Sequence, residues 1–350
     1  MLALKENTEE LNRIADLAKI RIRIIGCGGG GTNILTQINQ KDHGEAKTVA
    51  INTDASHLLK KVSADGKILI GKNLTRGMGA GNNPEIGKLA ALESQDYIKK
   101  AVFGQDVIFI VATLGGGTGT GSAPIVAKLA KENRSLVFSI VTLPFESEGK
   151  EKMNNAKDWL PALSEYSDVI IVIPNQKLEE SMDKAKTYEE NFSLTANFIM
   201  DQITGLVKTI NDPGRINIDY QDLKKILLRS RSTFMAIGKS SGGEGRIDYA
   251  ISQALKNSFI NVDISKASGC LLRLIGSDIE LGEYNYAMKK IIDITGVDCE
   301  IIGGVEIRPD ITDGIYVFMV LTGVKSDYII GNGETIGKEL FGNVDAESFV

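Results

Sequence analysis

Residues 107–122 of this chain read VIFIVATLGGGTGTGS, an apolar run followed directly by a dense group of glycines. Val107–Val111 is apolar at every position, which is typical of a strand buried on both faces of a parallel sheet. Gly115–Gly121 then contains five glycines and two threonines. So many glycines cost conformational entropy unless the backbone must approach something closely. Because free amides and threonine hydroxyls form a dense array of donors, we interpret Gly115–Gly121 as a phosphate-binding loop. A flexible linker, the alternative, does not fit between two strongly structured flanks.

Similar apolar runs lie on both sides of this stretch, at 21–25, 48–51, 68–70, 136–143 and 169–173. Helical patterns separate them, including the amphipathic segment APIVAKLAK at 123–131. Unbroken apolar strands that alternate with helices are typical of a parallel sheet covered on both faces. We therefore predict a doubly wound α/β domain over residues 20–180.

The second half of the chain has a different pattern. Apolar residues from Thr187 to Ile210 follow a helical period, and the sequence NDPG at 211–214 ends it, which predicts a long central helix within 181–215. Beyond it we expect strands at 233–237, 269–275, 300–302 and 315–321, and helices at 247–257 and 282–294. These elements predict a smaller α+β domain over 216–330, with an N-terminal extension at 1–19 and a short tail at 331–350.

The composition excludes several classes of protein. The chain has 350 residues, 43% of them apolar and 24% charged, which suits about two globular domains. No apolar run approaches the roughly 20 residues of a membrane span, and a net charge of −5 argues against broad nucleic-acid binding. Three cysteines and two histidines offer little material for disulfides or a metal centre. We expect a cytoplasmic protein with no nucleic-acid partner, no integral membrane segment and no metal site of its own.

A second glycine run, at 26–31, stands between the strand at 21–25 and a helix expected from about Asn33. Taken alone, it is either a phosphate-binding loop or a tight turn. A P-loop is excluded, because no lysine follows either glycine run at the required spacing. A dinucleotide fold remains an alternative, with Asp54 as its ribose-binding acid, but it leaves Gly115–Gly121 unexplained.

The string GGGTGTG at 115–121 is the signature of the tubulin/FtsZ superfamily, and the chain is similar to FtsZ, the prokaryotic division GTPases, from about Ile20 to Val324. The other segments that match the FtsZ pattern, in order, are Gly28–Gly31 with Asn33, NTD at 52–54, GMGAGNNP at 77–84, PF at 144–145, EG at 148–149, IPN at 173–175 and NIDYQD at 217–222. The resemblance implies a tubulin/FtsZ-like fold: a doubly wound parallel-sheet GTP-binding domain, a long central helix and a smaller α+β C-terminal domain that activates GTP hydrolysis.

The resemblance also implies which residues bind GTP or GDP. Glu148 holds the ribose, Asn175 lies near the base, and an aromatic at Phe192 stacks on the guanine. The full set is Gly28, Gly29, Gly30, Gly31, Thr32, Asn33, Asn52, Asp54, Gly79, Ala80, Gly81, Gly115, Gly116, Gly117, Thr118, Gly119, Thr120, Gly121, Pro144, Glu148, Lys152, Asn175, Phe192, Ala196 and Asn197.

The implied catalytic residues are Asn217, Asp219 and Asp222. Two carboxylates three positions apart at the start of a helix share one face, where they can polarise a water near the γ-phosphate. The alternative is that Asp219 only caps the helix expected at 223–228. In this family the acidic loop of one subunit completes the site of the next. The resemblance therefore implies head-to-tail filaments, assembly-dependent hydrolysis of GTP, Mg²⁺ bound with the nucleotide, and a place at the division site with division-ring or membrane-anchor proteins.

The chain also departs from the family pattern. Lys152 stands in place of an arginine, and Ser147 replaces an aromatic. On the central helix, Ala196 occupies the position expected to read the base, with Asn197 beside it. Near the C-terminus we see neither a linker nor an anchor-binding peptide. At the other end we expect an amphipathic stripe that packs on the protein itself or on a partner or membrane: Leu2, Leu4, Leu11, Ile14, Ala15 and Leu17.

Two alternatives therefore remain open at this point. The first is a filament protein of the same fold that serves cell shape, DNA segregation or regulation. The second is a dinucleotide-dependent oxidoreductase.

Overall fold

The computed structural model describes residues 10, 19–176, 188–211, 215–216, 218–228, 233–256, 263–312 and 314–324, with the backbone alone for 188–192. Most of the predicted N-terminal extension, the whole tail at 331–350 and the catalytic candidate Asn217 lie outside these residues. Within them, no helix combines the length and the apolar character needed to cross a bilayer.

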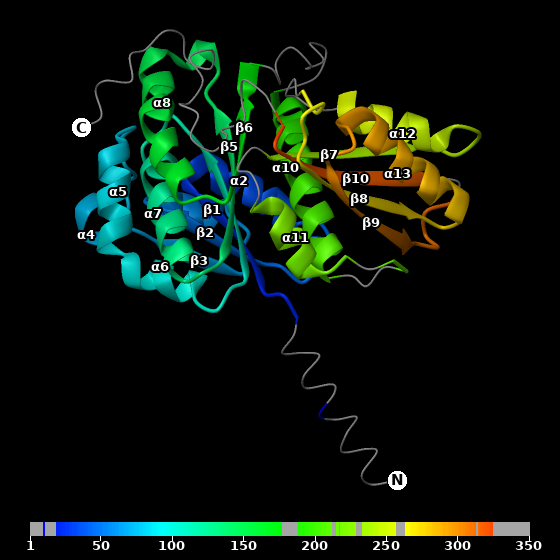
Figure 1. Cartoon of the computed structure of the whole chain (residues 1–350). Helices are drawn as coiled ribbons and strands as arrows, with labels where there is room; N and C mark the ends of the chain where they lie inside the picture. The colour runs from blue at the N-terminus through cyan, green and yellow to red at the C-terminus, as the bar shows by residue number, and fades with distance from the viewer. Residues whose placement is uncertain are drawn as a thin grey trace.

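A six-stranded parallel sheet forms the first half of the chain (Figure 1). The order of its strands is β3 (Gly66–Leu69), β2 (Lys47–Asn52), β1 (Ile22–Cys27), β4 (Val107–Thr113), β5 (Leu136–Leu143) and β6 (Val169–Pro174). Strand β4 is apolar from Val107 to Ala112 because its alternate residues enter two different cores: Val107, Phe109 and Val111 on one face, Ile108, Ile110 and Ala112 on the other. The predicted doubly wound sheet is confirmed.

Helices cover both faces of this sheet. On one face lie α2 (Gly28–Asn39) and the long helix α10 (Tyr188–Asn211). On the other lie α5 (Pro84–Glu93), α6 (Gln95–Val102), α7 (Thr118–Glu132) and α8 (Lys150–Glu165). Short helices α3 (Ala55–Lys60), α4 (Lys72–Thr75) and the 3₁₀ turn η1 (Glu146–Glu148) connect them. The apolar pattern did not predict α5, α6 or α8, because alanine and charged residues make up much of their length.

The second half is a four-stranded sheet in the order β7 (Thr233–Ser240), β10 (Ile315–Thr322), β8 (Gly269–Gly276) and β9 (Glu300–Ile307). It carries α11 (Tyr220–Leu227), α12 (Arg246–Lys256) and α13 (Leu281–Thr295). Strand β9 runs beyond the predicted 300–302, because Gly303 and Gly304, a residue type that is unfavourable inside a strand, still pair with β8. A side chain at Gly304 would lie 2.7 Å from the Cδ1 atom of Ile218, so glycine is needed there for packing.

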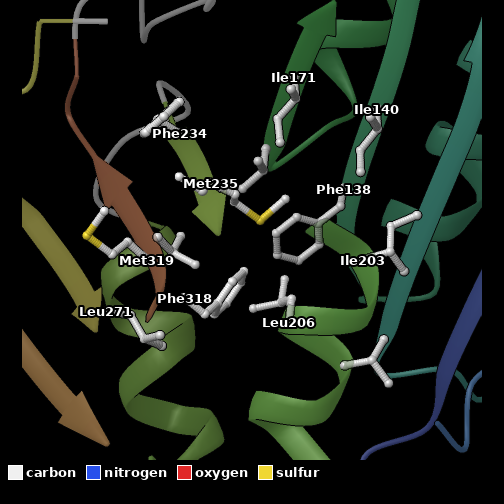
Figure 2. Packing of buried hydrophobic residues seen from close by; sticks show 14 of the residues in the cluster. Phe138, Ile140, Ile171, Ile203, Leu206, Phe234, Met235, Leu271, Phe318 and Met319 are labelled. Atoms are coloured by element: carbon white, nitrogen blue, oxygen red, sulfur yellow. The ribbon is translucent and has the colours of Figure 1, made fainter. Parts of the chain in front are cut away.

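One hydrophobic core joins the two sheets through α10 (Figure 2). Phe138 and Ile140 enter it from the first sheet, Ile203 and Leu206 from α10, and Phe318 from the second sheet. A Cβ added to Gly205 of α10 would lie 2.7 Å from the Phe318 ring, so the helix packs directly against the second sheet. The second sheet is therefore held firmly relative to the first.

Candidate functional site

The predicted nucleotide-binding residues that precede α10 lie after the carboxyl ends of the six parallel strands. Those of α2 follow β1, Asn52 and Asp54 end or follow β2, Gly79–Gly81 lies in the connection from β3, and Gly115–Gly121 follows β4. The remaining connections carry Pro144, Glu148, Lys152 and Asn175 after β5 and β6. The strand order reverses between the neighbours β1 and β4, and ligands of open α/β sheets bind at such a reversal.

Both glycine runs lead into the first turns of helices at this point. Helix α2 begins at Gly28 and α7 at Thr118, earlier than the expected starts near Asn33 and Ala123. The first amides of a helix have no partner within the helix, and its N-terminus carries a partial positive charge. A Cβ added to Gly28 would lie 2.5 Å from the amide nitrogen of Gly119, so the two helix N-termini meet. Their free amides point to an anion as the ligand of this edge.

Most glycines of the two runs are required by packing. A Cβ on Gly119 would lie 2.9 Å from the carbonyl oxygen of Cys27 and 3.0 Å from that of Thr113. One on Gly117 would lie 2.8 Å from the amide nitrogen of Asn83 and 2.9 Å from the Cβ atom of Ala80. Gly30, Gly31 and Gly121 are similarly close to Thr113, Val111 and Pro84. These positions build the frame of the site.

Gly29 and Gly116 are different. A Cβ added to either would meet no atom within 4 Å, and neither has a left-handed φ. Packing and backbone conformation therefore do not explain why these two positions are glycine, whereas a ligand that approaches the main chain would explain it. Gly79 and Gly81 also face open space, but their φ values of 92° and 58° are themselves a reason for glycine.

The threonine hydroxyls of the site brace its loops. The Thr118 hydroxyl lies 2.6 Å from that of Thr53, and the Thr120 hydroxyl accepts a hydrogen bond from the amide of Gly115 at 2.8 Å. Thr32 donates to the carbonyl of Gly28 at 2.7 Å. The three predicted binding threonines are buried. Their hydroxyls thus shape the loops, and the free main-chain amides of the two helix N-termini supply donors for an anion.

Cys27, directly before Gly28, is also fully buried. Burial raises the pKa of its thiol to about 12, with a weaker opposing effect from its hydrogen bond to Ser122. The thiol therefore stays protonated at neutral pH, and Cys27 contributes to this site through its backbone.

The segment after β2 is organised by Asn52, whose side chain is buried. Its Oδ1 atom accepts hydrogen bonds from the amides of Thr53 at 2.8 Å and Asp54 at 3.3 Å. Asp54 caps α3 by accepting from the amide of His57 at 2.9 Å. The predicted residues Asn52 and Asp54 therefore hold this loop in place, and His57, which the sequence did not single out, lies between them and Asn33.

The β5 connection brings Pro144 and Lys152 against Gly115, where an added Cβ would lie 2.5 Å from Pro144 Cγ and 2.9 Å from the Lys152 carbonyl oxygen. Lys152 Nζ forms an ion pair with Glu148 Oε2 at 2.9 Å. Asn155, one turn beyond Lys152 on α8, was not predicted. It donates to the carbonyls of Gly115 at 3.0 Å and Asn82 at 3.2 Å, and so ties two of the loops together.

The residues predicted to contact the base differ in their exposure. Ala196 is 1% exposed and belongs to the shared core, so its methyl group cannot contact a ligand. Asn197, beside it on α10, is partly exposed, and its Oδ1 atom accepts a hydrogen bond from Lys41 Nζ at 2.7 Å. Asn175 directly follows β6, and Phe192 lies in α10, where only its backbone is described.

The predicted catalytic acids lie at the start of α11, and both are exposed. Asp219 Oδ1 accepts a hydrogen bond from the amide of Gln221 at 2.8 Å, which confirms that Asp219 caps this helix. Asp222 stands in the first turn of the same helix. The cap uses one oxygen of Asp219, so its second oxygen and the whole carboxylate of Asp222 are available for chemistry.

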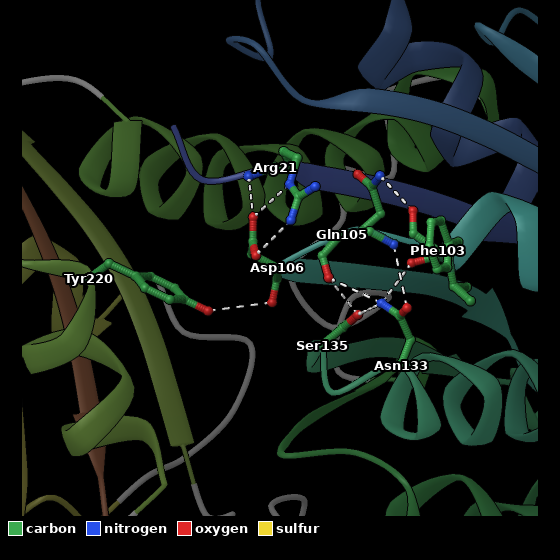
Figure 3. Close-up of polar contacts among 9 residues, drawn as sticks. Arg21, Phe103, Gln105, Asp106, Asn133, Ser135 and Tyr220 are labelled. Carbon is green, nitrogen blue, oxygen red and sulfur yellow. Dashed lines mark hydrogen bonds and ion pairs between the residues drawn. The ribbon is translucent and has the colours of Figure 1, made fainter. Parts of the chain in front are cut away.

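Contacts of Tyr220 fix where these acids lie relative to the first sheet (Figure 3). Its hydroxyl donates to the carbonyl oxygen of Asp106 at 3.4 Å, and Asp106 immediately precedes β4. The Asp106 carboxylate in turn accepts from Arg21, from the main-chain amide at 2.9 Å and from Nε at 3.1 Å. Partial burial would raise the pKa of Asp106, but the hydrogen bonds and charge of Arg21 outweigh it and lower that pKa.

Strand β4 therefore separates the acids from the glycine runs. Asp106 precedes its amino end and Gly115–Gly121 follows its carboxyl end. The seven residues of β4 span about 20 Å, at roughly 3.3 Å per residue. The two groups of predicted residues lie at opposite edges of one sheet, so this chain cannot bring its own acids to its own glycine runs.

Comparison with known proteins identifies the family. A model of the "Tubulin/FtsZ family, GTPase domain" matches residues 21–183, and a model of the "FtsZ family, C-terminal domain" matches residues 232–325. Cell division protein FtsZ 1 of Pyrococcus woesei is 40% identical over 327 residues, which cover 93% of this chain and 88% of that protein. The chain belongs to the FtsZ family.

Solved structures agree with this assignment to FtsZ. An empty FtsZ dimer of M. jannaschii has a TM-score of 0.81 and 39% identity, covering 91% of this chain and 92% of that chain. A GTPγS-bound protofilament of CetZ2 from Haloferax volcanii has a TM-score of 0.74 at 22% identity, covering 88% and 95%, and shows the fold alone. As a member of the FtsZ family the chain is a GTPase that binds guanine nucleotide. The dinucleotide oxidoreductase considered from the first glycine run is therefore wrong.

Proposed function

We propose that this chain binds GTP at the carboxyl edge of its parallel sheet and hydrolyses it only when the acids of a second copy reach that edge. The observation that carries this proposal is the position of β4 between the two groups of residues. Because one protomer holds both halves at opposite ends, a head-to-tail stack joins the acids of each copy to the nucleotide of the next. Such a contact does not close on itself, so it builds open filaments.

Within the nucleotide site, the amides of the first turns of α2 and α7 bind phosphate oxygens, and the open faces of Gly29 and Gly116 leave room for them. We assign the ribose contact to Glu148 and a phosphate contact to Lys152, and the two side chains form an ion pair with each other. Asn197 is the residue of α10 that we assign to the base, in place of the buried Ala196. Mg²⁺ bound with the nucleotide would neutralise charge on its phosphate oxygens.

For hydrolysis, we assign Asp222 and the free oxygen of Asp219 to the orientation and polarisation of the attacking water. Asn217, outside the described residues, keeps its predicted role beside them. Because binding and hydrolysis use different parts of the chain, we divide it into a GTP-binding domain at 20–180, a central helix at 181–215 and a GTPase-activating domain at 216–330.

We assign the filament to cell division, in the cytoplasm at the division site, because the relatives at about 40% identity carry the name cell division protein. Division-ring and membrane-anchor proteins are the partners that such a role requires. A role in cell shape, DNA segregation or regulation is less well supported, because the names of these relatives refer to cell division.

The test is the dependence of GTP turnover on protein concentration. Turnover per molecule is expected to rise steeply with concentration and to level off once filaments predominate, since an isolated protomer has only half of each site. Light scattering on the same samples reports assembly, and Asp222→Ala serves as the hydrolysis-deficient control. A turnover per molecule that is independent of concentration would contradict the shared site.

A further inference from the structure

The imidazole of His57 connects two residues of the nucleotide site. Its Nδ1 atom lies 3.2 Å from Asn52 Nδ2, and its Nε2 atom lies 3.0 Å from Asn33 Oδ1. Asn52 stands at the carboxyl end of β2 and Asn33 in the second turn of α2, so the ring bridges two elements that surround the phosphate-binding edge.

The surrounding hydrogen bonds decide which nitrogen of the ring carries the proton. Two main-chain amides, of Thr53 and Asp54, occupy the Oδ1 atom of Asn52. The NH₂ group of Asn52 must therefore face the ring and donate to Nδ1. The proton of the neutral imidazole then sits on Nε2 and is donated to Asn33 Oδ1.

This arrangement also fixes the orientation of Asn33. Because its oxygen is occupied by His57, Asn33 presents its NH₂ group, two donors, to anything bound beside α2. Asn33 is exposed and lies two residues beyond Gly31, in the turn that follows the first turn with its free amides. Such a donor suits an oxygen-rich ligand, such as a nucleotide phosphate or ribose.

We propose that His57 is a positioning residue for the guanine nucleotide, which it serves by fixing the amide of Asn33 with its donors toward the ligand. This rests on the proposed nucleotide site. Local structure does not need the ring, because Asp54 already caps α3 and main-chain amides already hold Asn52. Of the two contacts of the ring, with Asn52 Nδ2 and with Asn33 Oδ1, only the second involves a side chain that the main chain does not already hold.

The test compares three variants by titration with a fluorescent GDP derivative, at protein concentrations below those that support assembly. His57→Phe keeps a ring of similar size but has no polar atom. His57→Gln keeps one acceptor and one donor in the same order. Ser56→Ala, at the exposed neighbouring position of α3, is the matched control. Thermal unfolding of each variant reports whether it is folded.

His57→Phe should weaken GDP binding roughly three- to tenfold, as expected for lost hydrogen bonds, and raise the KM for GTP while leaving kcat at saturating GTP within about twofold. His57→Gln should restore most of the affinity, and Ser56→Ala should match the wild type. In an Asn33→Ala background, His57→Phe should add little further loss, because the ring acts through Asn33.

A folded His57→Phe variant that binds GDP as tightly as the wild type would overturn the proposal. Losses that simply add in the Asn33→Ala, His57→Phe double variant would overturn it as well. Failure of the wild-type protein itself to bind guanine nucleotide would instead refute the proposed nucleotide site, so the two failures are distinguishable.

Discussion

The hydroxyl of Tyr220 lies 3.4 Å from the main-chain carbonyl oxygen of Asp106 and donates a hydrogen bond to it. One partner begins α11, beside the acids Asp219 and Asp222, and the other precedes β4. This contact fixes the acidic helix beneath the amino edge of the parallel sheet, while Gly115–Gly121 lies beyond the opposite edge. A subunit that stacks on this edge therefore meets acids whose position is tied to the nucleotide-binding sheet.

Replacement of Tyr220 by phenylalanine removes this hydrogen bond and keeps the ring. We expect a loss of about 0.5–1 kcal/mol in the free energy of unfolding, as for one partly exposed hydrogen bond. GTP turnover should fall severalfold while GDP binding stays unchanged, because the acids lose their fixed position and the nucleotide edge does not change. Urea titration and a phosphate-release assay measure the two effects. Tyr249→Phe, at an exposed tyrosine of α12, is the control, and equal turnover in both variants would contradict the expected role.

The same residue predicts a dependence of stability on alkaline pH. Burial raises the pKa of Tyr220 to about 12, and the charges of Asp106 and Asp168 act in the same direction. An unfolded tyrosine loses its proton near pH ~10, so the folded chain holds the proton that the unfolded chain releases. This contribution to stability is full below about pH 10 and is lost as the pH rises toward about 12. The free energy of unfolding of Tyr220→Phe should therefore fall less steeply over that range than that of the wild type. If the two free energies fall in parallel as the pH rises, the predicted contribution of Tyr220 is wrong.

Two substitutions at Asp219 separate capping from catalysis. Asp219→Ala removes the acceptor of the Gln221 amide and should cost about 1 kcal/mol of stability together with turnover. Asparagine caps a helix as well as aspartate does, so Asp219→Asn should keep the stability and still lose turnover, because an amide carries no negative charge. Chemical denaturation and GTP hydrolysis by the two variants provide the comparison. Wild-type turnover in Asp219→Asn would mean that the cap is the whole role of this residue.

The contrast between packed and open glycines gives a further prediction. Gly116→Glu places a carboxylate where a Cβ meets no atom, so stability should change by less than about 1 kcal/mol while GTP binding is lost through charge repulsion. Gly119→Ala forces a methyl group against the carbonyls of Cys27 and Thr113 and should destabilise the fold by about 1–3 kcal/mol. Denaturation and nucleotide titration of both variants test the pair. Tight GTP binding by Gly116→Glu would argue against phosphate at this position.

Sequence patterns located the strands of the parallel sheet, because a run such as Val107–Val111 is apolar at every position when both of its faces are buried. They missed most of β9, where two glycines interrupt the apolar run. They predicted less about the helices around the site. Helix α8 is largely polar and alanine-containing, so its register, and with it the contacts of Asn155 with two loops, could not be read from apolar spacing. The i, i+3 spacing of Lys152 and Asn155 was the one available signal.

For the site, sequence could indicate which segments are involved but not which atoms face a ligand. Thr118 and Thr120 look like phosphate donors in the string GGGTGTG, yet their hydroxyls bind Thr53 and the amide of Gly115. Gly116 and Gly119 are indistinguishable in that string, and only the neighbouring strands and helices make one open and the other packed. His57 was passed over because a lone histidine after NTD carries no motif, and its partners Asn33 and Asn52 come from separate elements.

The shared active site is tested most directly by mixing two variants that are each inactive. Asp222→Ala keeps the nucleotide edge but lacks an acid, and Gly116→Glu keeps both acids but should not bind GTP. We predict that neither hydrolyses GTP alone, and that turnover appears on mixing and increases as Gly116→Glu is added to a fixed amount of Asp222→Ala. A mixture that stays inactive at concentrations where the wild type hydrolyses GTP, with Asp222→Ala still binding nucleotide, would contradict a site completed by the neighbouring subunit.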